Sequence, residues 1–157
     1  MRLVSMFFAF LFLALVPASA QDLRFRSVTV DVSPIAARGY PTFARKVEYA
    51  LVPVAAEAFG GLVDPADPRG LSLVIRIVTV ELPVVTGAGG DGTLDTMRSE
   101  GLVIDPKGHI VARASILSPV TAWITVASLP LELEEQRRIR ALGMHGVYWL
   151  RTRLTGL

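Results

Sequence analysis

Apolar residues at helical spacing predict two amphipathic helices. In residues 40–59 an apolar side chain recurs every three or four positions, as on one face of a helix. Pro41 suits the first turn, Gly60-Gly61 is expected to end the helix, and Pro53 is expected to kink it or end its regular part. A second helical pattern runs from about Leu131 to Leu154. The two apolar faces comprise Tyr40, Phe43, Ala44, Val47, Leu51, Val54 and Ala58, and then Ile139, Leu142, Val147, Leu150 and Leu154.

Glycines interrupt the second helical pattern at Gly143 and Gly146. Each weakens an isolated helix by about 1 kcal/mol relative to alanine. Their presence therefore predicts a close backbone approach where this helix crosses a sheet.

Period-two alternation predicts the first strands. Valines alternate with polar residues within 22–33, while the apolar residues before them lie on the opposite phase. This change of phase predicts either a bulge near Arg26-Ser27 or an edge strand that passes between two environments. Residues 71–82 are apolar on both phases, as expected of a central strand. Arg76, the one charge inside that strand, is expected to reach a partner or the sheet edge.

Turn residues predict a hairpin in the second half of the chain. Residues 97–105 and 109–117 are expected to pair across Asp105-Pro106-Lys107-Gly108, which suits a type I turn. The glycine-rich residues 83–96 are expected to form a surface loop, since they lack the Gly-Lys-Ser/Thr end of a phosphate loop. Residues 120–126 alternate again, as either a short strand or an extended connector.

The element order is therefore β-α-β-β-β-α. It predicts an α+β fold, a two-layer sandwich in which two helices cover one face of a mostly antiparallel sheet. The sheet has four strands, or five if residues 120–126 form another. Residues 21–157 are expected to form one domain, since the chain contains neither an internal repeat nor an interdomain linker.

The first 20 residues have the layout of a secretory signal peptide. A charge at Arg2 precedes the apolar run 3–16, and Pro17 and Ala18-Ser19-Ala20 follow. The run is shorter than the roughly 20 residues that span a bilayer as a helix, which favours cleavage after Ala20 over retention as an anchor. The remaining chain is expected to be periplasmic or secreted, with no transmembrane segment. Removing this peptide brings the apolar content, 52% in the full chain, to an ordinary globular value.

Charge argues against nonspecific nucleic-acid binding. Without Arg2 the chain has 15 Lys and Arg against 14 Asp and Glu, a net charge of +1. Such binding needs a concentrated basic face.

Residues for catalysis or metal binding are few and scattered. His109 and His145 fit no ligand-spacing motif, cysteine is absent, and Ser99 has no nucleophile signature around it. Glu81 and Glu100 are a carboxylate pair only if their strands are neighbours. The sequence therefore predicts no cofactor, no metal and no catalytic residue.

Five arginines on the second helix form the one candidate binding surface. They are Arg137, Arg138, Arg140, Arg151 and Arg153. One interpretation is a solvated, salt-bridged face, in which Glu134 pairs with Arg138. The other is contact with lipid phosphates or an acidic partner. Replacing Arg137, Arg138 and Arg140 with glutamine is expected to leave folding nearly intact.

The layout of residues 22–155 resembles that of small Gram-negative envelope proteins. It is similar to the lipopolysaccharide-assembly lipoprotein that plugs an outer-membrane translocon, and to the N-terminal domain of periplasmic propeller proteins. Those lipoproteins have an acylated cysteine after the leader, whereas this chain has Gln21. The resemblance implies two helices on a small sheet and carries over no functional residue.

We therefore expect a non-enzymatic binding or accessory protein, acting in envelope assembly or transport. Its partner would be an envelope protein or an anionic lipid surface, bound through a sheet edge, the glycine-rich loop or the arginine-bearing helix. The alternative is a small periplasmic hydrolase or small-ligand carrier with a pocket between helix and sheet.

Overall fold

The computed structural model describes residues 23–83, 94–121 and 131–156. The predicted signal peptide, residues 1–20, lies outside the described residues. So do residues 84–93 of the glycine-rich loop and residues 122–126 of the alternating segment.

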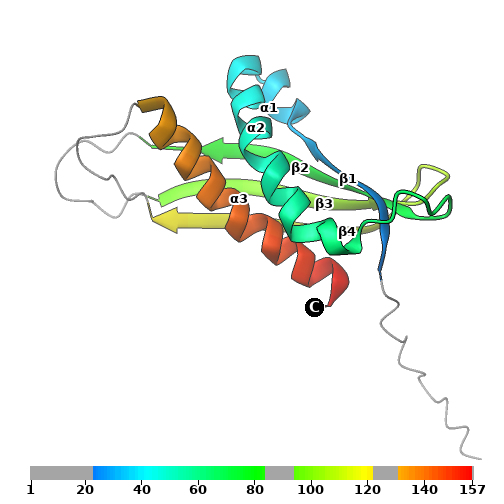
Figure 1. Ribbon diagram of the computed structural model, residues 1–157. Coiled ribbons are helices and arrows are strands. Elements are labelled where there is room, and N and C mark those ends of the chain that lie inside the picture. Colours follow the sequence, from blue (N-terminus) through cyan, green and yellow to red (C-terminus); the bar gives the residue numbers. More distant parts are fainter. Residues whose placement is uncertain (1–22, 84–93, 122–130, 157) are drawn as a thin grey trace, which may run out of the picture.

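A four-stranded sheet in the order β1-β2-β3-β4 forms one layer of the fold (Figure 1). β1 runs parallel to β2, and the other neighbours are antiparallel. The α+β class with a mostly antiparallel sheet is thus confirmed. The parallel pair arises because the chain crosses over through helices between β1 and β2. The strands are β1 (Phe25–Asp31), β2 (Leu71–Glu81), β3 (Leu94–Ile104) and β4 (Ile110–Thr121).

Two long helices form the second layer on one face of the sheet, as predicted (Figure 1). They are α2 (Pro41–Phe59), over β1, and α3 (Leu131–Thr155), over β3 and β4. The pattern did not predict the short helix α1 (Ser33–Ala37), which starts with Pro34 in its first turn. A 3-10 turn, η1 (Gly60–Leu62), follows α2.

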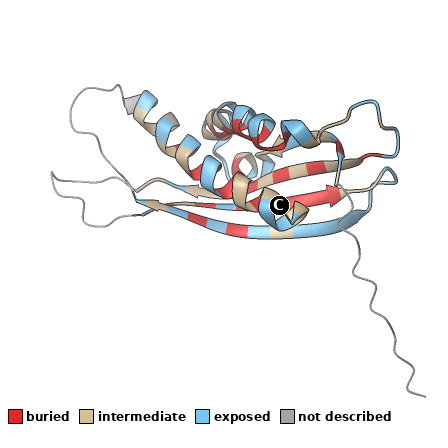
Figure 2. Cartoon of the chain, turned by 60° about the horizontal axis from the view of Figure 1, so that its bottom comes forward, coloured by how far each residue is buried: buried red, intermediate tan, exposed pale blue. Residues whose placement is uncertain are grey.

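The core lies between the two layers, and Figure 2 shows the buried residues where helices and sheet face one another. Phe25 of β1 and Phe59 of α2 meet edge to face, with ring centroids 5.8 Å apart. Leu51 of α2 and Ile75 of β2 are fully buried in the same hydrophobic cluster. Of the two outcomes expected at Pro53, an end of the regular helix is wrong, because α2 continues through Pro53 to Phe59, and a kink stays a prediction.

The pairing of β1 with β2 confirms two sequence predictions. The register shifts between Phe25 and Ser27, which is the expected bulge. The central charge of β2, Arg76, has its partner one strand away, where its Nε donates to Asp31 Oδ2 at 3.0 Å. Asp31 also accepts from the Ser33 backbone N–H. Burial acts to raise the pKa of Asp31, but the bonds from Ser33 and Arg76 outweigh it and hold this pKa below its usual value.

The predicted hairpin is confirmed, with longer strands on both sides. The Gly108 N–H donates to the Asp105 carbonyl at 3.0 Å, and Gly108 takes a φ of +89°, which suits glycine. Asp105 Oδ1 accepts the backbone N–H groups of Lys107 and His109. β3 begins at Leu94, inside the predicted loop, and β4 continues through Ser118-Pro119 to Thr121 instead of ending at Leu117.

The two glycines of α3 lie at close approaches, one of which was predicted. A Cβ at Gly146 would lie 2.7 Å from Ser118 Oγ and 3.1 Å from Met97 Cε, so this turn of α3 rests directly on the sheet. A Cβ at Gly143 would clash instead with Leu51 of α2. The close approach at Gly143 is therefore between the two helices rather than between helix and sheet.

Candidate functional site

The two histidines lie apart on the surface. His109 follows the hairpin turn, where its Nδ1 is 3.2 Å from Asp105 Oδ2. Contact with His109 and Lys107 holds the pKa of Asp105 below its usual value, chiefly through the His109 backbone N–H. His145 is exposed on α3. Within residues 23–83, 94–121 and 131–156, no three His, Asp or Glu side chains group as metal ligands.

The carboxylate pair considered from the sequence does not converge. Glu81 and Glu100 are on neighbouring strands, but Glu81 lies opposite Thr96, and Glu100 lies opposite Arg76. Four residues along β3 separate the two positions by about 13 Å. Ser99 is fully buried, and its hydroxyl has no partner among the described residues. A nucleophile needs an adjacent base and access to substrate, and Ser99 has neither among the described residues.

The five arginines of α3 do not form one surface. Arg138 reaches the start of β3, where its Nε donates to Asp95 Oδ2 at 2.8 Å and its Nη2 bonds to Asp95 Oδ1 and the Pro83 carbonyl. Asp95 is buried, and the Arg138 side chain is 14% exposed. The side-chain bond to Asp95 raises the pKa of Arg138 further. Glu134, the predicted partner of Arg138, instead pairs with Arg137.

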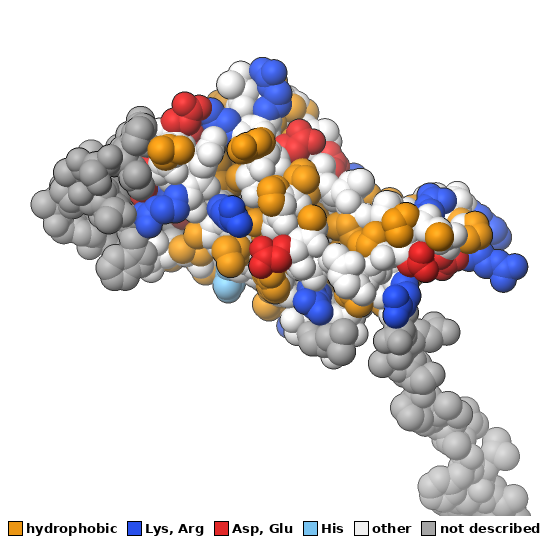
Figure 3. Space-filling model, in the orientation of Figure 1, with side chains coloured by type: hydrophobic (Ala, Val, Ile, Leu, Met, Phe, Trp, Pro, Cys, Tyr) orange, Lys and Arg blue, Asp and Glu red, His pale blue; other side chains and the backbone are white. Residues whose placement is uncertain are grey.

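The other arginines lie on different parts of α3. Arg153 stacks on Trp149, with Cζ 4.6 Å from the ring centroid, and Arg151 is half-buried. Arg137 and Arg140 line a groove of about 420 Å³ between α2 and α3, together with Tyr49, Ala50, Pro53, Leu133 and Gln136. Figure 3 shows hydrophobic and basic side chains side by side over these helices.

The edge of the sheet at β4 exposes both side chains and backbone. Pro119 has no N–H and lies opposite Thr96, so its nitrogen must point away from β3. Because backbone direction alternates along a strand, the N–H and C=O groups of Arg113, Ser115 and Leu117 also point away from β3. Val111 and Leu117 are 55% and 54% exposed. No strand of the described chain pairs with this side of β4.

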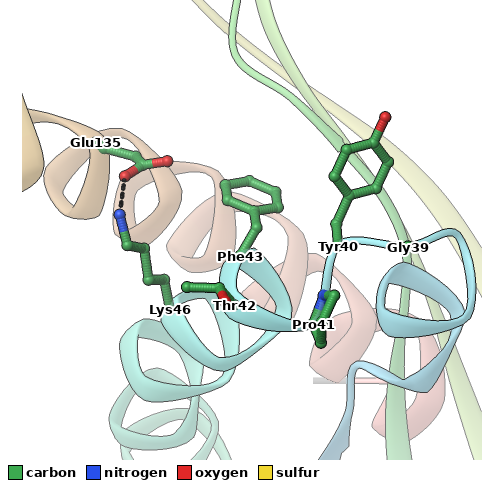
Figure 4. Close-up of a pocket in the computed structure, with 7 residues that line it drawn as sticks. All are labelled: Gly39, Tyr40, Pro41, Thr42, Phe43, Lys46 and Glu135. Carbon is green, nitrogen blue, oxygen red and sulfur yellow. Dashed lines mark hydrogen bonds and ion pairs between the residues drawn. The ribbon is translucent and has the colours of Figure 1, made fainter.

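Two hollows share the Tyr40 and Phe43 side chains. One lies where α1, α2 and β2 meet, and the other, drawn in Figure 4, lies between the start of α2 and Glu135 of α3. Gly39, with a φ of +93°, turns the chain between the helices and sets Tyr40 just before α2. The Tyr40 and Phe43 side chains stand side by side in Figure 4. On one side they line a space of about 590 Å³ with Ile35, Arg38, Thr79, Val80 and Glu81. On the other they line about 320 Å³ with Gly39, Pro41, Thr42, Lys46 and Glu135.

Ion pairing differs between the two hollows, and we call the larger one, lined by Arg38 and Glu81, the Tyr40 hollow. Lys46 Nζ bonds to Glu135 Oε2 at 2.8 Å and lies 3.7 Å from Glu132 Oε1. The bond to Glu135 raises the pKa of Lys46. Among the described residues the guanidinium of Arg38 has no ion-pair partner, and Glu81 only accepts the Thr96 hydroxyl at 3.4 Å. Each therefore offers an unneutralised charge to the hollow.

Sequence reasoning missed the Tyr40 hollow and the role of Arg138. The signal for the first was Gly39-Tyr40-Pro41, in which an aromatic residue sits at a helix start between two turn residues. The pairing of Arg138 with Asp95 joins residues 43 positions apart and has no local signal.

No helix in the described part of the chain combines the length and the apolar character needed to cross a membrane. No protein-family model, no curated protein sequence and no solved structure matches this chain.

Proposed function

We propose that this chain is a non-enzymatic binding and accessory protein of the bacterial envelope, and that it recruits an extended segment of a partner protein along the edge of β4. The supporting observation is the outward row of backbone groups at Arg113, Ser115 and Leu117. An unpaired edge of this length is a template for an added strand. The dispersal of histidines and carboxylates in the described chain favours binding over hydrolysis.

Charge next to the edge favours a particular kind of segment. Arg98 lies opposite Leu117, and Arg113 lies on the same open face of the sheet. Both are exposed, and neither has an ion pair with another described residue. A strand that alternates apolar and acidic residues would cover Leu117 and Val111 and neutralise these charges.

The same charges disfavour a second copy of this chain as the partner. Antiparallel pairing of two β4 strands about Ser115 would set Arg113 of one copy opposite Leu117 of the other. Leu117 already neighbours Arg98, so two arginines would flank one leucine, while the nearest acidic residue of β3, Glu100, lies opposite Ser115. Like charges across strands destabilise a sheet.

The test uses an eight-residue peptide alternating valine and glutamate, with a valine and lysine peptide as its matched control. We expect the acidic peptide to bind at least about tenfold tighter. The amides of Arg113, Ser115 and Leu117 should then exchange hydrogen more slowly. S115P removes one outward N–H without breaking the ladder to β3, so it should abolish binding, whereas S115T should retain it.

Three results would overturn this proposal. They are equal binding of both peptides, equal binding by S115P, and amide protection elsewhere in the chain. If the chain self-associates and S115P abolishes this self-association, the strand added at β4 would come from a second copy of this chain and not from a partner protein.

The location outside the inner membrane is part of the proposal and has its own test. Expression of the full chain in a Gram-negative host, followed by fractionation and N-terminal sequencing, should yield a periplasmic protein that starts at Gln21. Recovery of the uncleaved chain with membranes would contradict it.

A further inference from the structure

We propose that the Tyr40 hollow binds a short apolar peptide with free ends, as a zwitterion. This inference does not depend on strand addition at β4. The alternative function considered from the sequence, a small-ligand carrier, requires a pocket between helix and sheet. The present proposal gives that pocket a specific class of ligand.

The size and lining of the Tyr40 hollow suit a small ligand. A space of about 590 Å³ is within the range of ligand sites, which are mostly apolar with a few polar groups at defined places. Ile35, Phe43 and Val80 supply apolar surface, and Ile35 is buried in the core, which makes this surface rigid. Tyr40, 62% exposed, supplies an aromatic wall that a ligand would cover.

The charges of the hollow specify the ends of the ligand. Arg38 ends α1, and Glu81 ends β2, so they approach the hollow from different layers. They form no ion pair with each other although both line it. Two opposite charges that line one largely apolar hollow without pairing complement a molecule with a carboxylate at one end and an ammonium at the other. Lys46 is already paired with Glu135 and so does not compete for the carboxylate.

An apolar dipeptide meets these conditions. Its carboxylate would pair with Arg38, which offers a bidentate donor, and its ammonium with Glu81. Its side chains would contact Phe43, Val80 and the Tyr40 ring. A fatty acid would leave Glu81 facing its chain, and an alkylamine would leave Arg38 unneutralised.

The experiment compares Leu-Phe with its N-acetyl form and its C-terminal amide, by calorimetry or nuclear magnetic resonance titration. We expect free Leu-Phe to bind at least about fivefold tighter than either capped form, because each cap removes one ion pair at a partly exposed site. R38Q should remove the preference for the free carboxylate, and E81Q should remove the preference for the free ammonium.

R45Q and E48Q are the matched controls, since both change exposed charges of α2 outside the hollow. Both should keep the full preference, and thermal melts should show that all four variants fold. Equal binding of the three peptides, no binding, or preferences that survive in R38Q and E81Q would overturn the proposal. S115P should bind Leu-Phe normally, so failure at the hollow and failure at the β4 edge are distinguishable.

Discussion

The helices α2 and α3 lie on the same face of the sheet but contact their surroundings through side chains of different kinds. α2 buries large apolar residues such as Leu51 and Phe59, and Phe59 meets Phe25 of β1. α3 combines large residues with a glycine, Gly146, set directly over Ser118, and with an ion pair to Asp95. The α2 contact therefore depends on apolar area, whereas the α3 contact also depends on close fit and charge.

Removal of an aromatic side chain should have the largest effect, on the α2 side. F59A leaves a cavity beside Phe25, and we expect it to lower the free energy of unfolding by about 3–5 kcal/mol. Urea denaturation measures this loss. V52A, at an exposed site on the same helix, should change stability by less than about 0.5 kcal/mol. A loss below about 1 kcal/mol for F59A would mean that the core at Phe25 re-forms without the ring.

The ion pair of α3 should give the next largest effect. R138Q leaves the Asp95 carboxylate buried without its partner, at a cost of about 2–4 kcal/mol. This corrects the sequence-based expectation that glutamine at Arg137, Arg138 and Arg140 leaves folding nearly intact. R140Q, in the same denaturation series, should be close to neutral. Adding D95N to R138Q should recover part of the lost stability. If R138Q leaves the free energy of unfolding unchanged, the stabilising role of the Arg138–Asp95 pair is contradicted.

Acid should lower the free energy of unfolding through one carboxylate on the α2 side and one in the β3–β4 hairpin. The loss should be smaller than that caused by F59A or by R138Q. Asp31, on the α2 side, and Asp105, in the hairpin under α3, both have folded pKa values below the usual one. Their contributions are complete above the unfolded pKa, near 4, and decline as pH falls through the folded pKa. Denaturation between pH 5 and pH 2 should show this decline. D31N and D105N should each flatten part of it, and an unchanged profile in both would contradict the assignment.

The smallest effect should come from the serines under α3. Ser99 and Ser118 have buried hydroxyls with no partner among the described residues. S99A and S118A remove these groups, so stability should stay equal or rise by up to about 1 kcal/mol. Thermal melts would measure this change in stability, with S115A, at an exposed serine, as the control. A clear loss would mean that these hydroxyls are hydrogen-bonded.

Local patterns were sufficient for most of the fold. The spacing of Val47, Leu51 and Val54 predicted α2, and Asp105-Pro106-Lys107-Gly108 predicted the hairpin, because both signals involve neighbours in sequence. The strand predicted to end at Leu117 continues through Ser118-Pro119 because proline is tolerated where an edge strand turns its nitrogen to the outside.

The candidate sites were less predictable than the fold. Five arginines concentrated on the second predicted helix suggested one surface, yet Arg138 has a partner 43 positions earlier in the chain. The Tyr40 hollow combines α1, which the pattern did not indicate, with the end of β2. Both depend on tertiary contacts, which the local pattern of a single sequence does not specify.

The parallel pairing of β1 has a consequence for the order of folding. Val28 pairs with Leu73, so β1 must wait for a partner 45 residues later in the chain, whereas β3 and β4 are joined by a short turn. Local pairings form faster than distant ones. During synthesis, β1 emerges first and stays without a partner until β2 has emerged, whereas β3 and β4 emerge one directly after the other. Until β2 follows, the nascent chain presents an unpaired strand that chaperones can bind.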